Sequence, residues 1–138
     1  MAIIDAETGT AVPGANLVRI THIMYALHAF SAVTGMLTPA LIVTAFLTGW
    51  PSIIAVIINY VNRGRVTGTY LDSHFSWQLR TFWFAVMWVI IGWLLIVTII
   101  GIVVGVPLLL LVGVWVLYRI VRGWIALANR EPVPARRP

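Results

Sequence analysis

Two long apolar stretches dominate the chain, from Ile20 to Asn62 and from Thr81 to Tyr118. They contain 43 and 38 residues without a charged side chain. As single helices rising about 1.5 Å per residue, they would measure roughly 65 and 57 Å. The hydrocarbon core of a bilayer is only about 30 Å thick, so neither stretch fits as one crossing. The pattern therefore predicts an all-α integral membrane protein made of two helical hairpins, with four hydrophobic helices.

The second stretch predicts the firmer hairpin, with helices near Thr81–Ile100 and Val106–Ala128. Gly101, Gly105 and Pro107 lie between them and favour a turn. Proline has no backbone N–H to lose in the first turn of a helix, so Pro107 suits the start of the last helix.

The segment SHFSWQLR, residues 73–80, precedes this hairpin. It combines aromatic and arginine side chains, which anchor helices at the membrane surface, and is expected to form an interfacial start to the third helix. Asp72 and Ser73 are the expected N-cap residues, because their short side chains can accept hydrogen bonds from free backbone N–H groups.

The first stretch has two interpretations. In one, the chain turns at Thr38–Pro39 and crosses the membrane twice. In the other, a longer helix runs from about Thr21 to Leu47, breaks at Gly49 and restarts at Pro51. The restarted helix would be about 20 Å long, which is short for a crossing and would make it re-entrant or interfacial. The second interpretation gives three crossings and an external N-terminus.

Composition supports the membrane assignment. Hydrophobic residues make up 61% of the 138 residues, charged residues only 9%, and mean hydropathy is +0.99. A soluble domain of this size keeps too much surface in water to hide so much apolar area. We expect one transmembrane domain, with a polar N-terminal tail (1–18), a first hairpin (20–62), a loop (63–72), a second hairpin including its interfacial start (73–128), and an extended C-terminal tail (129–138).

The charged residues lie in three clusters at the ends of the predicted hairpins. Two hairpins would place all three clusters on one side of the membrane. Arginine-rich loops favour the cytoplasm, so both termini and the 63–72 loop should be cytoplasmic. The clusters are Asp5, Glu7 and Arg19; Arg63, Arg65, Asp72 and Arg80; and Arg119, Arg122, Arg130, Glu131, Arg136 and Arg137.

The chain has a net charge of +5, and its positive charges come from arginine, since it contains no lysine. Beside apolar runs, such clusters indicate binding to anionic lipid headgroups and not to nucleic acid. The N-terminus lacks the basic region of a signal peptide. Side chains expected to contact lipid or a partner subunit are Arg63, Arg65, Arg80, Arg119, Arg122, Trp77, Trp83 and Trp124.

Histidine supplies the weak candidates for a cofactor site. His28 and His74 could ligate haem or a metal from different helices, although a structural role is commoner. His22 and His28 are six residues apart and should face different directions on one helix. We therefore expect no cofactor and no metal.

Asn59 is the most informative polar residue inside the apolar runs. An amide without a partner is costly in lipid, so Asn59 should face the bundle. No Asp, Glu or Lys lies deep in either run, which argues against a proton relay and against a hydrolase. The chain has no cysteine. The sequence thus predicts a non-enzymatic protein.

Three segments carry a family resemblance: INYVNR (Ile58–Arg63), SHFSWQLRTFWF (Ser73–Phe84) and YRIVRGWIAL (Tyr118–Leu127). Together they resemble a family of small proteobacterial membrane proteins that is distantly similar to the twenty-kilodalton import component of the chloroplast Tic translocon. The resemblance implies a bacterial inner-membrane protein and supplies no active-site residues.

The leading functional prediction is an accessory or assembly subunit of a larger inner-membrane complex. One alternative is a translocation or small-solute channel formed by an oligomer, with a path lined by Asn59, Ser and Thr residues and His28. A second alternative is a haem-binding membrane protein that uses His28 or His74.

Overall fold

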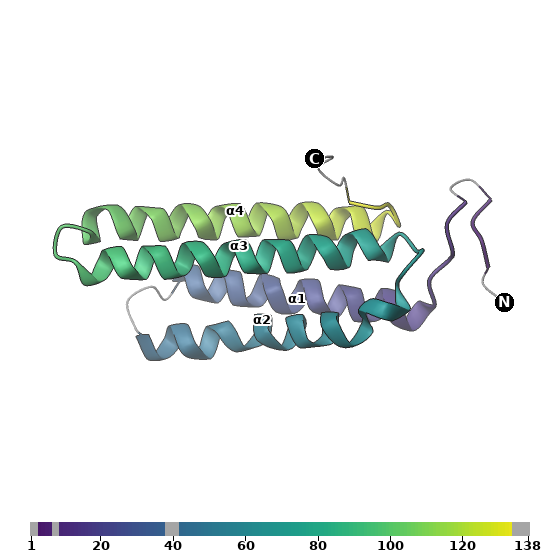
Figure 1. The fold of residues 1–138 in the computed structure, drawn as a ribbon, viewed down its shortest axis with the longest axis horizontal. Coiled ribbons are helices and arrows are strands. Elements are labelled where there is room, and N and C mark those ends of the chain that lie inside the picture. Colours follow the sequence, from purple (N-terminus) through teal and green to yellow (C-terminus); the bar gives the residue numbers. More distant parts are fainter. Residues whose placement is uncertain (1–2, 7–8, 38–41, 134–138) are drawn as a thin grey trace.

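The computed structural model describes residues 3–6, 9–37 and 42–133, with side chains throughout except at 42–48 (Figure 1). Within these ranges the fold is helical. Its elements are α1 (Ala15–Leu37), α2 (Ile42–Asn62), the 3₁₀ turn η1 (Arg63–Arg65), α3 (Leu71–Val97) and α4 (Ile102–Ala128).

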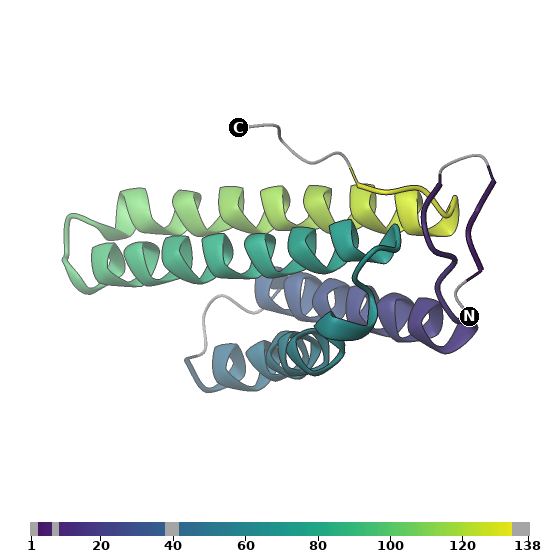
Figure 2. The ribbon, with the colours of Figure 1, turned by 45° about the vertical axis from the view of Figure 1, so that its right-hand side comes forward.

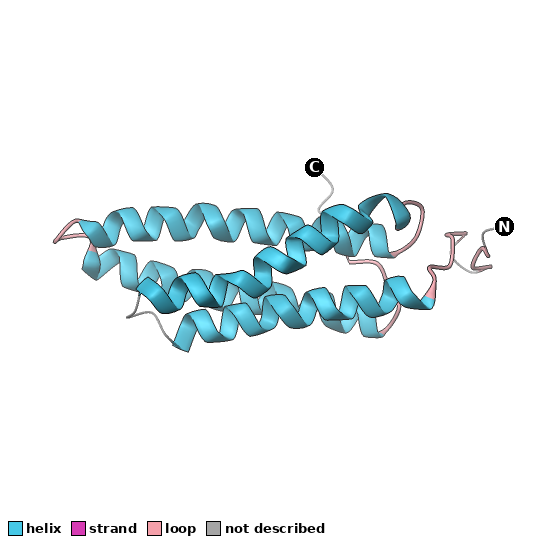
Figure 3. Cartoon of the chain, turned by 90° about the horizontal axis from the view of Figure 1, so that it is seen from below, coloured by secondary structure: helices cyan, strands magenta, loops and turns pink. Residues whose placement is uncertain are grey.

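Three of these helices, α1, α3 and α4, are long and apolar enough to cross a membrane. This finding is consistent with a multi-pass membrane protein. In Figures 1 and 2, α3 and α4 lie side by side, and α1 and α2 lie below them. Helix α1 also contacts α4 and so joins the two pairs. Seen from below, α2 runs at an oblique angle to α1, and the two helices diverge toward the end that holds the α2–α3 loop (Figure 3).

The structure tests the helix break that one interpretation of the first stretch requires. Helix α2 continues through Gly49 and Pro51, so the predicted break there is wrong. The position of the other predicted turn, Thr38–Pro39, lies outside the described residues. Helix α1 begins at Ala15, inside the segment assigned to the polar tail. It starts there because Leu17, in its first turn, is buried in the core. The sequence pattern did not indicate this early start, because the charged Arg19 follows two residues later.

The second stretch also forms longer helices than predicted. The interfacial segment is continuous with α3, which begins at Leu71 and ends at Val97. Asp72 and Ser73 lie in its first turn, so their prediction as N-caps is wrong. The N-cap residue is Tyr70, whose side chain makes no capping hydrogen bond. In the turn before it, the Thr69 hydroxyl accepts a hydrogen bond from the Leu71 N–H at 3.2 Å.

Helix α4 ends at Ala128 as predicted but begins four residues early, at Ile102. Pro107 therefore lies inside the helix. Gly101 forms the turn, because a Cβ there would overlap the Leu95 carbonyl. Gly105 has a second role: a Cβ there would meet Ile96 Cγ1 at 2.7 Å and the Gly92 carbonyl oxygen at 2.9 Å. Glycine thus allows α3 and α4 to approach closely.

The segments predicted as tails are held against the helices where they are described. Residue Ala11 donates its N–H to the Gly68 carbonyl at 3.1 Å, which ties the N-terminal segment to the α2–α3 loop. Val133 is buried, and its N–H donates to the Ser73 hydroxyl at 3.0 Å. As far as Val133, the segment predicted as a C-terminal tail is therefore packed against α3.

The two ends of the bundle differ in packing. The described N-terminal segment, the α2–α3 loop and the end of α4 share one end of the bundle (Figure 1), and the fully buried side chains gather there. They include Met24, Tyr25, Val66, Leu71 and Phe75. At the opposite end the apolar side chains face outward, and Ile99 is 91% exposed. The helices are thus closely packed at the charged end and leave space toward the uncharged end.

Candidate functional site

A cavity of about 410 Å³ lies between the helices toward the uncharged end. This volume falls within the range of roughly 300–1,000 Å³ found for small-molecule sites. All four helices contribute to its wall, which is mostly apolar. The lining residues include Ala32, Ile53, Phe82, Ala85, Val89, Trp93, Leu109 and Val116.

Small residues at facing positions leave this space open. Helix α1 contributes Gly35, α2 contributes Gly49 and α3 contributes Ala85 to the lining. Gly113 of α4 also lines the cavity, but there an added Cβ would meet Met36 Cγ at 2.7 Å. Larger side chains at these positions would fill the gap between the helices as they do at the charged end. The cavity therefore results from small side chains at this height of the bundle.

His28 and Ser52 bring polar atoms to the cavity. His28 Nδ1 and Ser52 Oγ are 3.0 Å apart, and this hydrogen bond joins α1 to α2. The His28 side chain is only 7% exposed, and its Nε2 atom has no hydrogen-bond partner. A buried nitrogen of this kind costs free energy unless something else pairs with it.

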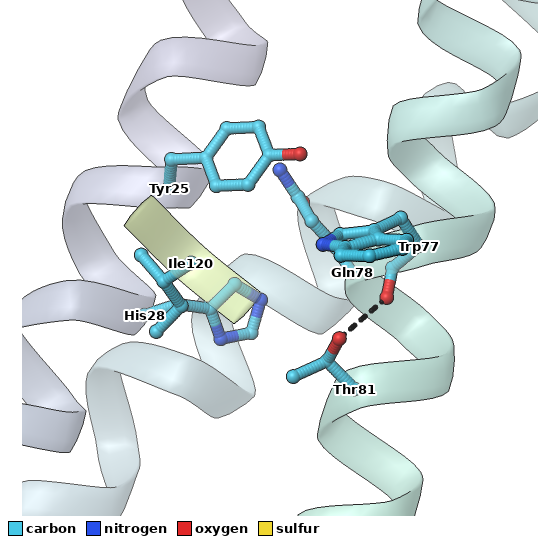
Figure 4. A pocket seen from close by; sticks show the side chains of 6 residues that line it. All are labelled: Tyr25, His28, Trp77, Gln78, Thr81 and Ile120. Carbon is cyan, nitrogen blue, oxygen red and sulfur yellow. Dashed lines mark hydrogen bonds between the residues drawn. The ribbon is translucent and has the colours of Figure 1, made fainter. Parts of the chain in front are cut away.

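A second, much smaller cavity of about 20 Å³ lies on the other side of His28. Figure 4 shows its six lining side chains, with the His28 ring directed toward those of α3. They are Tyr25, His28, Trp77, Gln78, Thr81 and Ile120. Gln78 is 3% exposed, and neither atom of its amide completes a well-formed hydrogen bond.

A buried hydrogen-bond chain begins beside this cavity. The Tyr25 hydroxyl and His74 Nδ1 are 2.9 Å apart, and His74 Nε2 is 2.7 Å from the Glu131 carbonyl oxygen. A carbonyl only accepts, so Nε2 carries the proton and Nδ1 of the neutral ring accepts from Tyr25. Both nitrogens of His74 are thus occupied, and haem ligation by His74 would require breaking one of these two bonds.

Arg119 lies among aromatic side chains beside the small cavity. Its guanidinium lies 3.5 Å from the centre of the Trp77 ring, and its Nε donates to the Thr81 hydroxyl at 2.9 Å. Trp77 in turn donates its indole N–H to the Arg119 carbonyl at 3.0 Å. Both residues, predicted to contact lipid or a partner, are half-buried and bonded within the chain.

The other predicted contact residues lie on the surface or between helices. Trp83 donates to the Tyr60 hydroxyl at 3.2 Å, and Trp124 donates to His22 Nδ1 at 2.9 Å. Arg63, Arg65, Arg80 and Arg122 are exposed at the charged end. Arg65 bonds Asn62, and Arg122 bonds the Tyr118 hydroxyl.

Asn59 faces the inside of the bundle, as predicted from the free-energy cost of an unpaired amide in lipid. It is fully buried and donates to the Phe75 carbonyl at 3.1 Å, which joins α2 to α3. His22 and His28 bond to different helices, as their spacing predicted. Near the charged end, burial raises the pKa of Tyr70 above its ordinary value, against the opposing charge of Arg130.

Sequence reasoning did not single out Tyr25, Ser52 or Gln78 as site residues. The available signal was spacing: Tyr25 and His28 are three apart on α1, and His74 and Gln78 are four apart on α3. Such pairs share one helix face. Among the described residues, no group of three or more His, Asp or Glu side chains could hold a metal ion.

Comparisons with known protein families, curated proteins and solved structures find no match for this chain. The family resemblance of the three segments therefore stays a prediction, and the function must be argued from the cavities.

Proposed function

We propose that this protein is a non-enzymatic membrane protein that binds one elongated apolar molecule between its helices. The observation that carries the proposal is the 410 Å³ cavity with its apolar wall. In lipid, a cavity of this size is filled by hydrocarbon, and a wall built from all four helices can select one shape of molecule over bulk acyl chains.

The chemistry of the lining supports binding without catalysis. The residues that line the two cavities, all in the described part of the chain, include no carboxylate. His28 and Ser52 are bonded to each other, yet no acid stands behind the ring to complete a nucleophile–base–acid set. The described carboxylates, Asp5, Asp72 and Glu131, belong to the charged end.

The membrane and orientation are part of the same proposal. We infer that α2 completes a fourth crossing, so that α1–α2 and α3–α4 form two hairpins. Arginines at the end of the bundle that holds the α2–α3 loop then place that end in the bacterial cytoplasm. The binding cavity would lie in the half of the inner membrane away from the cytoplasm.

The experiment is to purify the protein from native membranes in mild detergent and to measure the mass of the intact complex by native mass spectrometry. We expect one small molecule of several hundred daltons per chain. Ala85→Phe fills the cavity and should abolish this retained mass. Val103→Phe, at a lipid-facing position that is 78% exposed on α4, adds the same kind of ring outside the cavity and should keep it.

Two results would overturn the proposal. One is a wild-type chain that carries no bound molecule, and the other is equal retention by Ala85→Phe. Circular dichroism of both variants must show unchanged helix content, so that loss of the ligand is not loss of the fold.

The predicted role as an accessory subunit would use the same cavity. A partner's helix packed over the opening of this cavity would cover part of the same apolar wall, and the chain would then help to assemble a complex. Co-purification of a second protein, lost with Ala85→Phe, would favour that role over ligand binding. The channel alternative receives less support, because Asn59 is bonded inside the bundle and fully buried.

A further inference from the structure

Two exposed arginines, Arg63 and Arg80, lie at the borders of the two charge-free runs. Arg63 directly follows the run that ends at Asn62, and Arg80 directly precedes the run that begins at Thr81. In a membrane, both therefore lie where the hydrocarbon core meets the headgroups. Within the described part of the chain, neither side chain makes a hydrogen bond or an ion pair.

Other arginines at the same end of the bundle are bonded within the chain. Arg65 donates to Asn62 Oδ1 at 2.9 Å, and Arg122 donates to the Tyr118 hydroxyl at 2.8 Å. Arginine keeps its charge in any environment, and its guanidinium forms bidentate hydrogen bonds with phosphate. The two unpaired guanidiniums are therefore available to an anion from outside the chain.

A hydrogen bond between aromatic side chains brings these two arginines to one face of the molecule. The Trp83 indole donates to the Tyr60 hydroxyl at 3.2 Å, which joins α3 to α2. Arg63 follows Tyr60 by three residues, and Arg80 precedes Trp83 by three. Residues three apart share a helix face, so the two arginines flank the Tyr60–Trp83 pair. Tyrosine and tryptophan at such a place are typical of the headgroup level of a membrane.

The register of α2 against α3 supports this arrangement. Asn59 of α2 donates to the Phe75 carbonyl of α3 at 3.1 Å, so the end of α2 lies beside the first turns of α3. Asp72 lies on α3 two turns before Arg80, and it forms no ion pair among the described residues. Two arginines against one carboxylate leave this face with a net positive charge.

Apolar side chains continue the same face toward the uncharged end. Ile57, one turn before Tyr60, is 56% exposed, and Met87, one turn after Trp83, is 43% exposed. Positive charge, then an aromatic pair, then apolar surface is the order that matches phosphate, glycerol and acyl chain in a phospholipid. A soluble phosphate or an acidic protein segment would bind the arginines and leave the apolar side chains uncovered.

We propose that the surface formed by Tyr60, Arg63, Arg80 and Trp83 binds one anionic phospholipid. The two guanidiniums bind the phosphate, the two rings support the glycerol region, and an acyl chain lies along the apolar side chains of α2 and α3. This site is separate from the cavity of the proposed function, because none of the four residues lines that cavity. It adds a second ligand of different chemistry.

The experiment titrates the delipidated full-length protein in detergent with phosphatidylglycerol or phosphatidylcholine of identical acyl chains and counts bound lipids by native mass spectrometry. The wild type should bind phosphatidylglycerol about tenfold more tightly, the scale expected for one or two arginines near a membrane surface. Arg63→Gln combined with Arg80→Gln should bind the two lipids equally. Arg19→Gln combined with Arg122→Gln removes the same charge from exposed positions on α1 and α4 and should keep the preference.

Two results would overturn the site itself. One is equal binding of the two lipids by the wild type; a co-purifying protein that the Arg63→Gln and Arg80→Gln variant loses would then assign the arginines to a subunit contact. The other is an equal loss of preference in both double variants, which would make the effect one of net charge. Displacement of phosphatidylglycerol by glycerol phosphate at millimolar concentration would mean that the headgroup alone is recognised, and would overturn the assignment to a lipid.

The Ala85→Phe variant separates this inference from the proposed function. It should lose the molecule in the cavity and keep the preference for phosphatidylglycerol. If it loses that preference as well, the anionic lipid occupies the cavity and the separate surface site is wrong. If the wild type carries no molecule in the cavity but prefers phosphatidylglycerol, the proposed function fails and the surface site stands.

Discussion

At the scale of residues, hydrogen bonds made by buried or half-buried side chains connect the helices and add to their van der Waals packing, since the hydrophobic effect does little between helices in lipid. His28–Ser52 joins α1 to α2, Asn59 joins α2 to α3, and Tyr25–His74 joins α1 to α3. The need of Asn59 for a partner could be predicted from its cost in lipid. The hydrogen-bond chain through Tyr25 and His74 could not be predicted, because it depends on which faces of α1 and α3 meet.

Replacing Tyr25 with phenylalanine tests the buried hydrogen-bond chain through His74. The substitution keeps the ring but leaves His74 Nδ1 without its donor and Gln78 without the hydroxyl beside it. We expect a loss of about 1–3 kcal/mol in unfolding free energy, the cost of unpaired buried groups. Thermal unfolding in detergent would measure it. Tyr118→Phe removes an exposed hydroxyl bonded to Arg122, and its midpoint should stay near that of wild type.

At the scale of elements, hydropathy and charge located the helical regions, and the end of the last helix was predicted at the correct residue, Ala128. Helix starts were predicted less well. α1 begins before a charged residue because Leu17 packs into the core. α3 begins early, after a turn in which the Thr69 hydroxyl accepts from the Leu71 N–H. Both causes lie in tertiary contacts or loop geometry, which hydropathy does not report.

The close approach of α3 and α4 gives a prediction for this scale. Gly105→Ala places a methyl group against Ile96 and the Gly92 carbonyl, and backbone cannot move aside cheaply. We expect about 1–3 kcal/mol of destabilisation from overpacking. Gly35→Ala is the matched control, because nothing lies within 4 Å of its added Cβ. Alanine favours helix over glycine, so that variant should unfold at the same temperature or higher. Equal losses in the two would contradict the packing role of Gly105.

At the scale of the whole molecule, the chain concentrates its charges and its closed core at one end and leaves the other end open around a cavity. The sequence pattern predicted the grouping of charges. It did not predict the cavity, because the small residues that create it are spread over four helices and become neighbours only in the folded bundle.

Topology is the last prediction, and the absence of cysteine makes it directly testable. Single substitutions Ile3→Cys, Thr67→Cys and Ile99→Cys place a thiol at exposed positions on the N-terminal segment, the α2–α3 loop and the α3–α4 turn. If α1–α2 and α3–α4 both double back through the bilayer, a membrane-impermeant maleimide added to spheroplasts should label only the Ile99→Cys variant. The other two should react once the membrane is permeabilised, which controls for their accessibility. Labelling of Ile3→Cys and Thr67→Cys from opposite sides would mean an odd number of crossings before the loop, and α2 would then enter and leave on the same face.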